Sequence, residues 1–396
     1  MLKSRPSIRW PAGLLLAVLA WAWLRLFLHL RVAWSVNEQY AYGWAVPFLC
    51  VLLAWRRFQN AETLKTEALK PTPFSFSAFQ LFSILLFLAT RLVEEANPDW
   101  RLVSWALALE VTGLTLVFLF LSGDARTVKQ FAFPILFFLV AVPWPTPVEQ
   151  PLVQMLTRGI VALTVELLNL LGFPALTHGN VIETAGGLVD VDEACSGIRS
   201  LQAALMLALF FGEWRRLTAA RRVTLLGVSF VLACVFNLAR TVTLSLVAVK
   251  QGAAAVTRWH DPAGVTILLG CFCGVWAAAA WLARGGQARK WAGEKVSESP
   301  TPTFSLSHLP TFLPVMAALV MLVGEVAIHL WYASAPRVAT AEWRAEFPRG
   351  ESSFKTVELP TAARQILRYD EGESASPSNV IIEQLHRCPR FAHEHR

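Results

Sequence analysis

The sequence predicts an all-α polytopic membrane protein with a core of about eight helices and one further span. Of the 396 residues, 55% are hydrophobic and only 16% are charged, against roughly 25% charged residues in an ordinary globular domain. Apolar runs of about 20 residues recur along the chain, and this length crosses the roughly 30 Å of hydrocarbon in a bilayer. Many tryptophans fall at the ends of these runs, as in an aromatic belt. These observations exclude a soluble fold.

We expect spans at residues 11–30, 39–55, 76–93, 101–121, 128–143, 197–212, 223–249, 263–283 and 311–332. The first run is long and lacks a small-residue cleavage site, which indicates a retained span and not a signal peptide. Residues 150–171 are also apolar, but they carry Arg158 and Glu166 and follow Trp144-Pro145-Thr146-Pro147. We therefore predict an interfacial or re-entrant helix on the outer side for this segment.

Loop charges predict the orientation. With a cytoplasmic N-terminus, the inner loops hold seventeen Lys and Arg residues and the outer loops hold five, as the positive-inside rule requires. This bias holds only if residues 150–171 do not cross the membrane on their own. The net charge of +7 then reflects basic loops beside the membrane, and no basic patch interleaved with aromatic residues indicates nucleic-acid binding.

The remaining segments divide the chain further. Within 172–193, Val181-Ile182-Glu183-Thr184 and Leu188-Val189-Asp190-Val191 flank Gly186-Gly187, which predicts a short external β-hairpin. We expect a multi-span catalytic core at 1–284 and a polar cytoplasmic linker at 285–310. An additional transmembrane helix at 311–332 and a partly extended extracytoplasmic C-terminal tail at 333–396 follow.

Of six cysteines, Cys195 is placed for chemistry. No CxxC pair or zinc spacing occurs, and four cysteines lie inside apolar runs, where the thiol usually behaves as a small hydrophobe. Cys195 lies where an acidic loop meets an apolar helix, and the i, i+4 spacing predicts Arg199 on the same helix face. A helix N-terminus and a guanidinium both favour the thiolate. Cys195 is therefore a candidate nucleophile.

A nucleophilic cysteine needs a base and a group that stabilises the oxyanion. His178 and His260 are the histidines on the outer face, and His260 precedes Asp261 and Pro262, which we interpret as a helix cap and first turn. Arg240 lies 17 residues into the span that starts at Val223, roughly 25 Å along the helix, level with Cys195 and His260. Asn237 lies one turn away.

Other roles for these residues remain open at this point. Snorkelling and pairing with Glu110 are alternative roles for Arg240, and the intramembrane residues Arg25, Glu110 and Glu325 suit packing or pairing. The Glu94-Glu95 pair lacks ligand histidines at usable spacing, so a metalloprotease is not indicated. A serine-protease nucleophile elbow is not matched around Ser200.

The chain resembles the exosortase/archaeosortase family of membrane transpeptidases over about residues 10–283. The matching stretches are Gly179-Asn180-Val181-Ile182, Ala194-Cys195-Ser196-Gly197-Ile198-Arg199, Asn237-Leu238-Ala239-Arg240, and His260 with Gly264. The resemblance implies a catalytic Cys195, Arg240 and His260 with Arg199 and Asn237 in support. This chain differs from the family pattern at Ala185-Gly186-Gly187, where the family often has Pro-x-Gly. Residues 311–396 look similar to the membrane-anchored domain fused to some exosortases.

The function implied is a cysteine protease/transpeptidase of the bacterial cytoplasmic (inner) membrane with its active site on the outer face. Its expected substrates are membrane-anchored proteins with a C-terminal sorting signal: a motif, a hydrophobic helix and a basic end. The acceptor is an amine, a lipid or glycan, or water, and no metal or organic cofactor is implied. Two rivals remain: a transporter or polysaccharide-export component that uses Arg240 and Glu110, and a membrane acyltransferase that uses His260 with Asp261.

Overall fold

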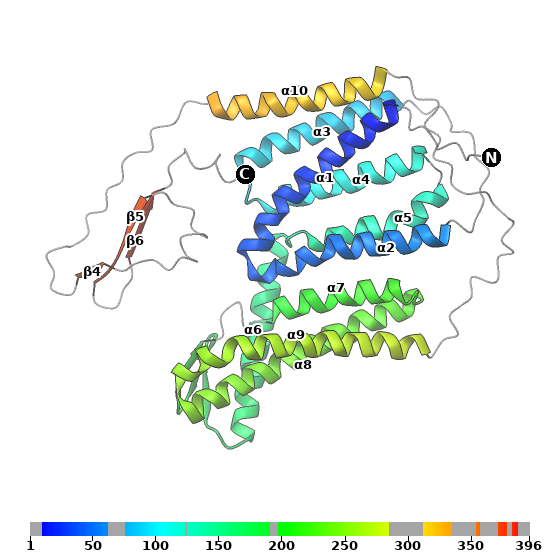
Figure 1. Cartoon of the computed structure of the whole chain (residues 1–396). Coiled ribbons are helices and arrows are strands. Elements are labelled where there is room, and N and C mark those ends of the chain that lie inside the picture. The colour runs from blue at the N-terminus through cyan, green and yellow to red at the C-terminus, as the bar shows by residue number, and fades with distance from the viewer. Residues whose placement is uncertain are drawn as a thin grey trace. The chain divides into compact units, whose positions relative to one another are not determined.

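The computed structural model describes residues 10–61, 76–122, 125–190, 197–284, 312–334, 354–356, 371–377 and 382–386. By its internal contacts the chain forms two compact units, Met1–Val320 and Met321–Arg396. The first unit holds a bundle of helices that run alongside one another (Figure 1). Six helices in the described part are long and apolar enough to cross a membrane. The chain is therefore a multi-span membrane protein.

The helices of the first unit follow most of the expected spans. They are α1 (Trp10–Val36), the 3₁₀ helix η1 (Glu38–Trp44), α2 (Ala45–Ala61), α3 (Phe76–Ala96), α4 (Arg101–Ser122), α5 (Ala125–Phe137), the 3₁₀ helix η2 (Phe138–Ala141), α6 (Thr146–Leu170), α7 (Ile198–Trp214), α8 (Ala219–Gln251) and α9 (Ala253–Arg284). The expected span at 39–55 is divided, because its first residues form η1.

The expected start of the last core helix is wrong. We interpreted Asp261 and Pro262 as a cap and a first turn, but α9 begins at Ala253 and keeps Pro262 in its interior. Proline lacks a backbone N–H, so it removes one helical hydrogen bond, and the helix continues past this single loss. Gly252, with φ +85, is the one residue between α8 and α9, so these two helices form a tight antiparallel hairpin.

Helix α6 takes a different course from its neighbours. Figure 1 shows α6 running across the other helices, at the end of the bundle that also holds the first sheet. Its 25 residues are long and apolar enough to cross a membrane by themselves. The crosswise course is nevertheless the one expected for an interfacial or re-entrant helix.

A small sheet packs on α6 and α8. It is antiparallel, in the order β1 (Ala175–His178), β2 (Val181–Thr184) and β3 (Gly187–Asp190). The expected hairpin is β2–β3, and β1 is an additional strand. Ile182 and Val189 of the sheet share a buried core with Val161 and Leu168 of α6 and Ala248 of α8. This core holds β3 against α6 and α8.

The turn between β2 and β3 lies directly against the backbone of α8. A Cβ on Gly186 would collide with the Ala248 carbonyl oxygen and with Val249 Cα. Only glycine permits so close an approach. Glycine at position 186 therefore has a structural reason in this chain.

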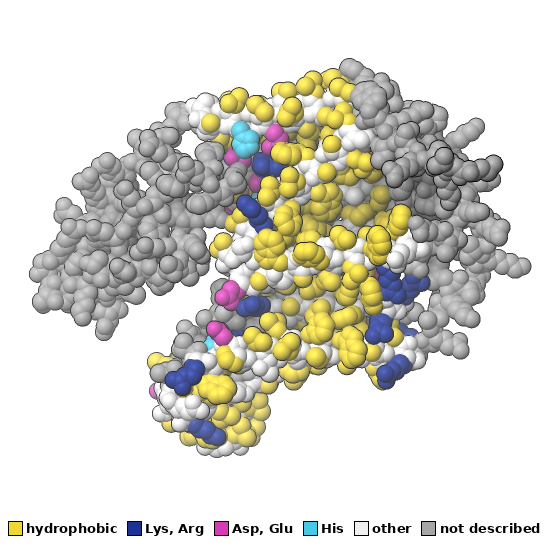
Figure 2. Space-filling view, in the orientation of Figure 1, with side chains coloured by type: hydrophobic (Ala, Val, Ile, Leu, Met, Phe, Trp, Pro, Cys, Tyr) yellow, Lys and Arg dark blue, Asp and Glu magenta, His cyan; other side chains and the backbone are white. Residues whose placement is uncertain are grey.

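At one end of the bundle the visible charged side chains are Lys and Arg, whereas at the other end Lys and Arg lie together with Asp and Glu (Figure 2). At the C-terminal end of α7, Glu213 bonds to Arg57 of α2 and lies 2.8 Å from Arg222 of α8. Arg56 donates to the Trp214 carbonyl and stacks over its ring at 4.3 Å. The sheet, the start of α7 and the α8–α9 turn lie at the opposite end, because the helices alternate in direction (Figure 1).

The second unit has little described structure. Helix α10 (Phe312–Ser334) reaches it from the first unit, and the strands β4 (Phe354–Thr356), β5 (Glu371–Pro377) and β6 (Ile382–His386) form an antiparallel sheet in that order. The linker expected at 285–310 lies outside the described residues.

Candidate active site

Arg240 and His260, which the sequence placed level with each other, are in contact. Arg240 lies on α8 and His260 on α9, and Arg240 Nη2 is 2.7 Å from His260 Nε2. The other ring nitrogen, Nδ1, is 3.2 Å from Asp261 Oδ1. Gly264, one turn beyond His260, faces the guanidinium, since a Cβ there would lie 3.9 Å from Arg240 Nη2. These two helices thus present a cation and an imidazole together.

Asn237 connects this pair to the start of α7. It lies three residues before Arg240 and its side chain is buried. Gly197, the residue before α7, has φ +83, and a Cβ on it would fall 2.6 Å from Asn237 Cγ and Nδ2. The left-handed backbone and the missing side chain both require glycine. The end of the Ala-Cys-Ser-Gly stretch is therefore fixed against the helix that carries Arg240.

Cys195 itself lies outside the described residues. The described residue that follows it by two, Gly197, contacts Asn237, and Arg240 lies one helical turn beyond Asn237.

The predicted relation between Cys195 and Arg199 involves a residue that lies outside the described part of the chain. Helix α7 begins at Ile198, and Gly197 has a left-handed backbone. Arg199 Nη1 lies 2.8 Å from Glu38 Oε2 of η1, with both side chains substantially exposed.

The alternative partners considered for these residues can also be assessed. Arg240 does not pair with Glu110, because Glu110 accepts a 2.6 Å hydrogen bond from Thr90 while Arg240 contacts His260. His178 lies on β1 and its Nε2 is 2.7 Å from Glu183 Oε2 on the next strand, where both side chains are exposed.

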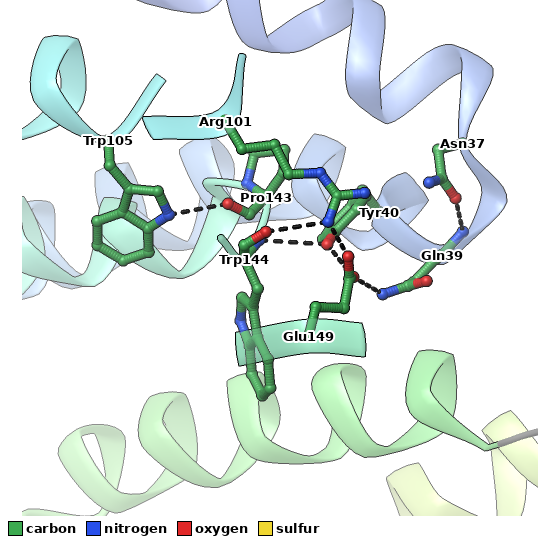
Figure 3. Close-up of polar contacts among 8 residues, drawn as sticks. All are labelled: Asn37, Gln39, Tyr40, Arg101, Trp105, Pro143, Trp144 and Glu149. Atoms are coloured by element: carbon green, nitrogen blue, oxygen red, sulfur yellow. Dashed lines mark hydrogen bonds and ion pairs between the residues drawn. The ribbon is translucent and has the colours of Figure 1, made fainter. Parts of the chain in front are cut away.

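A second polar cluster, the Glu149 cluster, was not predicted (Figure 3). The buried Glu149 carboxylate on the first turn of α6 accepts from Gln39 and Tyr40 of η1 and from Arg101 of α4. Arg101 also donates to the Trp144 carbonyl at 3.0 Å, and the Trp144 N–H donates to Tyr40 Oη at 3.2 Å. Burial raises the pKa of Tyr40, so its hydroxyl remains a donor.

Sequence reasoning missed the Glu149 cluster because it joins three stretches, at residues 39–40, 101 and 144–149, which are separated by more than 40 residues along the chain. The available signal was the acidic Glu149 two residues after Trp144-Pro145-Thr146-Pro147, in a segment otherwise rich in apolar residues. A buried acid in such a segment requires donors, but the sequence does not say which. The structure supplies them from η1 and α4.

The Glu94-Glu95 pair belongs to a third polar group. Glu94 contacts Arg91 and lies 2.9 Å from His29 Nδ1, and His29 Nε2 lies 2.7 Å from Ser104 Oγ. Arg91 and Glu94 are buried, so their charges compensate each other within the bundle. Among the residues that the structure describes, no group of three or more His, Cys, Asp or Glu side chains is arranged to hold a metal ion.

The fold and the site define a class of protein. It is a multi-span membrane protein in which an arginine–histidine pair lies close to the residue that precedes α7. The family model for transmembrane exosortases matches residues 34–277, more than half of the chain. The chain therefore belongs to the transmembrane exosortase family, and the matched residues include all the motif segments described above. No curated protein and no solved structure matches the chain.

Proposed function

We propose that this protein is a membrane cysteine protease/transpeptidase that cleaves C-terminal sorting signals and transfers the released acyl group to an acceptor. The observation that carries the proposal is the 2.7 Å contact between Arg240 and His260, one turn from the Asn237 that holds Gly197. Three motif segments, spread over more than 60 residues of the chain from Gly197 to His260, meet at one end of the bundle. Membership of the exosortase family supports the same activity.

In the proposed reaction, His260 accepts the Cys195 thiol proton and the thiolate sulfur attacks the scissile carbonyl carbon. The carbon–nitrogen bond then breaks, His260 returns the proton to the leaving amine, and a thioacyl enzyme remains. An amine, a lipid or glycan hydroxyl, or water attacks the thioester and regenerates the thiol. No net oxidation or reduction occurs in either step.

Arg240 would stabilise the oxyanion in both steps. Its Nε is buried and has no hydrogen-bond partner in the part of the chain that the structure describes, so a donor remains for a developing negative charge. Removing such a donor from a preorganised site typically costs two to three orders of magnitude in rate, about 2.7–4 kcal/mol. Arginine is suited to this role because its guanidinium remains charged in proteins.

The proposed orientation places the site on the outer face of the bacterial cytoplasmic membrane, with the N-terminus cytoplasmic. The cluster of arginines at the opposite end of the bundle supports it through the positive-inside rule. Substrates anchored in the same bilayer by a hydrophobic helix would meet the site at high effective concentration.

Co-expression with a tail-anchored substrate tests the proposal. We expect Cys195→Ala, Cys195→Ser, Arg240→Ala and His260→Ala to lose processing at normal membrane abundance. Cys234→Ala is the matched control, because Cys234 is another free cysteine, on α8, and its loss should leave processing unchanged. Full processing by Cys195→Ala would reject the thiol mechanism and favour an acyltransferase that uses His260 with Asp261, or a transporter.

A further inference from the structure

The contact with Arg240 determines the hydrogen-bond role of His260 Nε2. A guanidinium carries only donors, so His260 Nε2, 2.7 Å from Arg240 Nη2, must accept with its lone pair. An imidazole that accepts on Nε2 carries its proton on Nδ1. This is the tautomer that a base using Nε2 requires.

Asp261 is the acceptor for the remaining proton. Its Oδ1 lies 3.2 Å from His260 Nδ1, so the Nδ1–H donates to the carboxylate. We propose that Asp261 is a positioning residue that holds His260 in the tautomer with the lone pair on Nε2; this inference rests on the proposed function. Asp261 is 95% exposed, so its contribution to folding is small.

The need for Asp261 arises during turnover. At rest, Arg240 itself selects the Nδ1–H tautomer, because its donor occupies Nε2. When the guanidinium turns to the substrate oxyanion, that selection ends while His260 must still accept the Cys195 proton on Nε2. The Asp261 carboxylate then maintains the tautomer and stabilises the imidazolium until the proton passes to the leaving amine.

Substitutions of Asp261 in the full chain test this role through kcat and KM for a sorting-signal substrate. We expect Asp261→Asn to lower kcat about tenfold or more while KM and membrane abundance stay unchanged, and Asp261→Glu to recover part of the loss. The matched control is Asp99→Asn, which alters another exposed acid at the same end of the bundle, in the turn between α3 and α4. It should behave as wild type.

A double-mutant comparison separates this role from a structural one. The readout is the rate at which iodoacetamide alkylates Cys195 in a variant that lacks the other five cysteines. We expect Asp261→Asn to slow alkylation in the presence of His260 and to have no further effect in His260→Ala. Equal slowing in both backgrounds, or no change in kcat or alkylation, would overturn the inference.

The proposed function fails by a different result. If Cys195→Ala retains full processing, the thiol mechanism is rejected whatever Asp261 does. If processing requires Cys195, Arg240 and His260 but Asp261→Asn retains the wild-type kcat, only the positioning role of Asp261 is rejected.

Discussion

The Glu149 cluster and the Arg240–His260 pair are both polar groups in a largely apolar bundle, and they differ in how fully their hydrogen bonds are used. Glu149 is buried and receives donors from Gln39, Tyr40 and Arg101. Arg240 instead leaves its buried Nε without a partner in the described part of the chain, and the His260 side chain is 36% exposed. A carboxylate saturated with donors stabilises a fold, whereas an accessible pair with a spare donor can act on a substrate.

The largest expected effect on stability comes from Glu149→Ala. This change leaves Arg101 without its carboxylate and removes the acceptor shared by η1 and α4, which should cost about 3–5 kcal/mol. We expect a strong loss of membrane abundance and a lower thermal midpoint in detergent. The protein that still folds should keep most of its activity per molecule. A Glu149→Ala variant that is stable but inactive would contradict the assignment of a structural role to the Glu149 cluster and a catalytic role to the Arg240–His260 pair.

Arg240→Ala should give the converse result. We expect processing to fall by about a hundredfold or more, with the thermal midpoint close to wild type because the guanidinium's bonds are incompletely used. Arg240→Lys should recover little, since an ammonium cannot reproduce the guanidinium geometry. Both variants are compared by their processing rates, normalised to membrane abundance. Near-normal processing by Arg240→Ala would show that the Arg240–His260 pair is structural.

Two glycines with the same backbone conformation sharpen the comparison further. Gly197 and Gly172 have φ of +83 and +82, but a Cβ on Gly197 collides with Asn237 whereas a Cβ on Gly172 meets nothing within 4 Å. We expect Gly197→Ala to cost about 1–3 kcal/mol and to reduce processing, and Gly172→Ala to cost only the conformational strain of about 1 kcal/mol. Equal processing by the two variants would show that the Gly197–Asn237 contact does not position the site.

The smallest expected effect comes from the Glu38–Arg199 pair. Both side chains are substantially exposed, and such pairs contribute about 0–1 kcal/mol. We therefore expect Glu38→Gln to leave abundance and processing close to wild type. A large loss of processing with normal abundance would assign this pair a role at the site, as the sequence first suggested for Arg199.

Much of the helical fold could be predicted because each span is set by local composition. Helices α4 and α8 begin and end within a few residues of the apolar runs at 101–121 and 223–249. The start of α9 could not be predicted, because Asp261 and Pro262 form a common helix start and only the tertiary structure shows that the helix continues through them. Strand β1 was missed because its four residues carry too little pattern.

The site could be predicted in part for a similar reason. The level of Arg240 follows from counting residues along its span, and His260 was predicted at the outer end of the next span; their 2.7 Å contact agrees with these two levels. The Glu149 cluster depends instead on contacts between residues 39, 101 and 149, which no local pattern encodes. The place of Arg199 depended on where α7 begins, and helix starts are set by backbone conformation at single residues such as Gly197.

The most direct test of the account is to identify the residue that carries the acyl group during turnover. The full-length protein would be mixed with a sorting-signal substrate, quenched in acid to preserve thioesters, digested and analysed by mass spectrometry. The account predicts the substrate's N-terminal fragment on Cys195 as a hydroxylamine-sensitive thioester, accumulating when the acceptor is withheld. An acyl group found on another residue, with Cys195 unmodified throughout turnover, would contradict it.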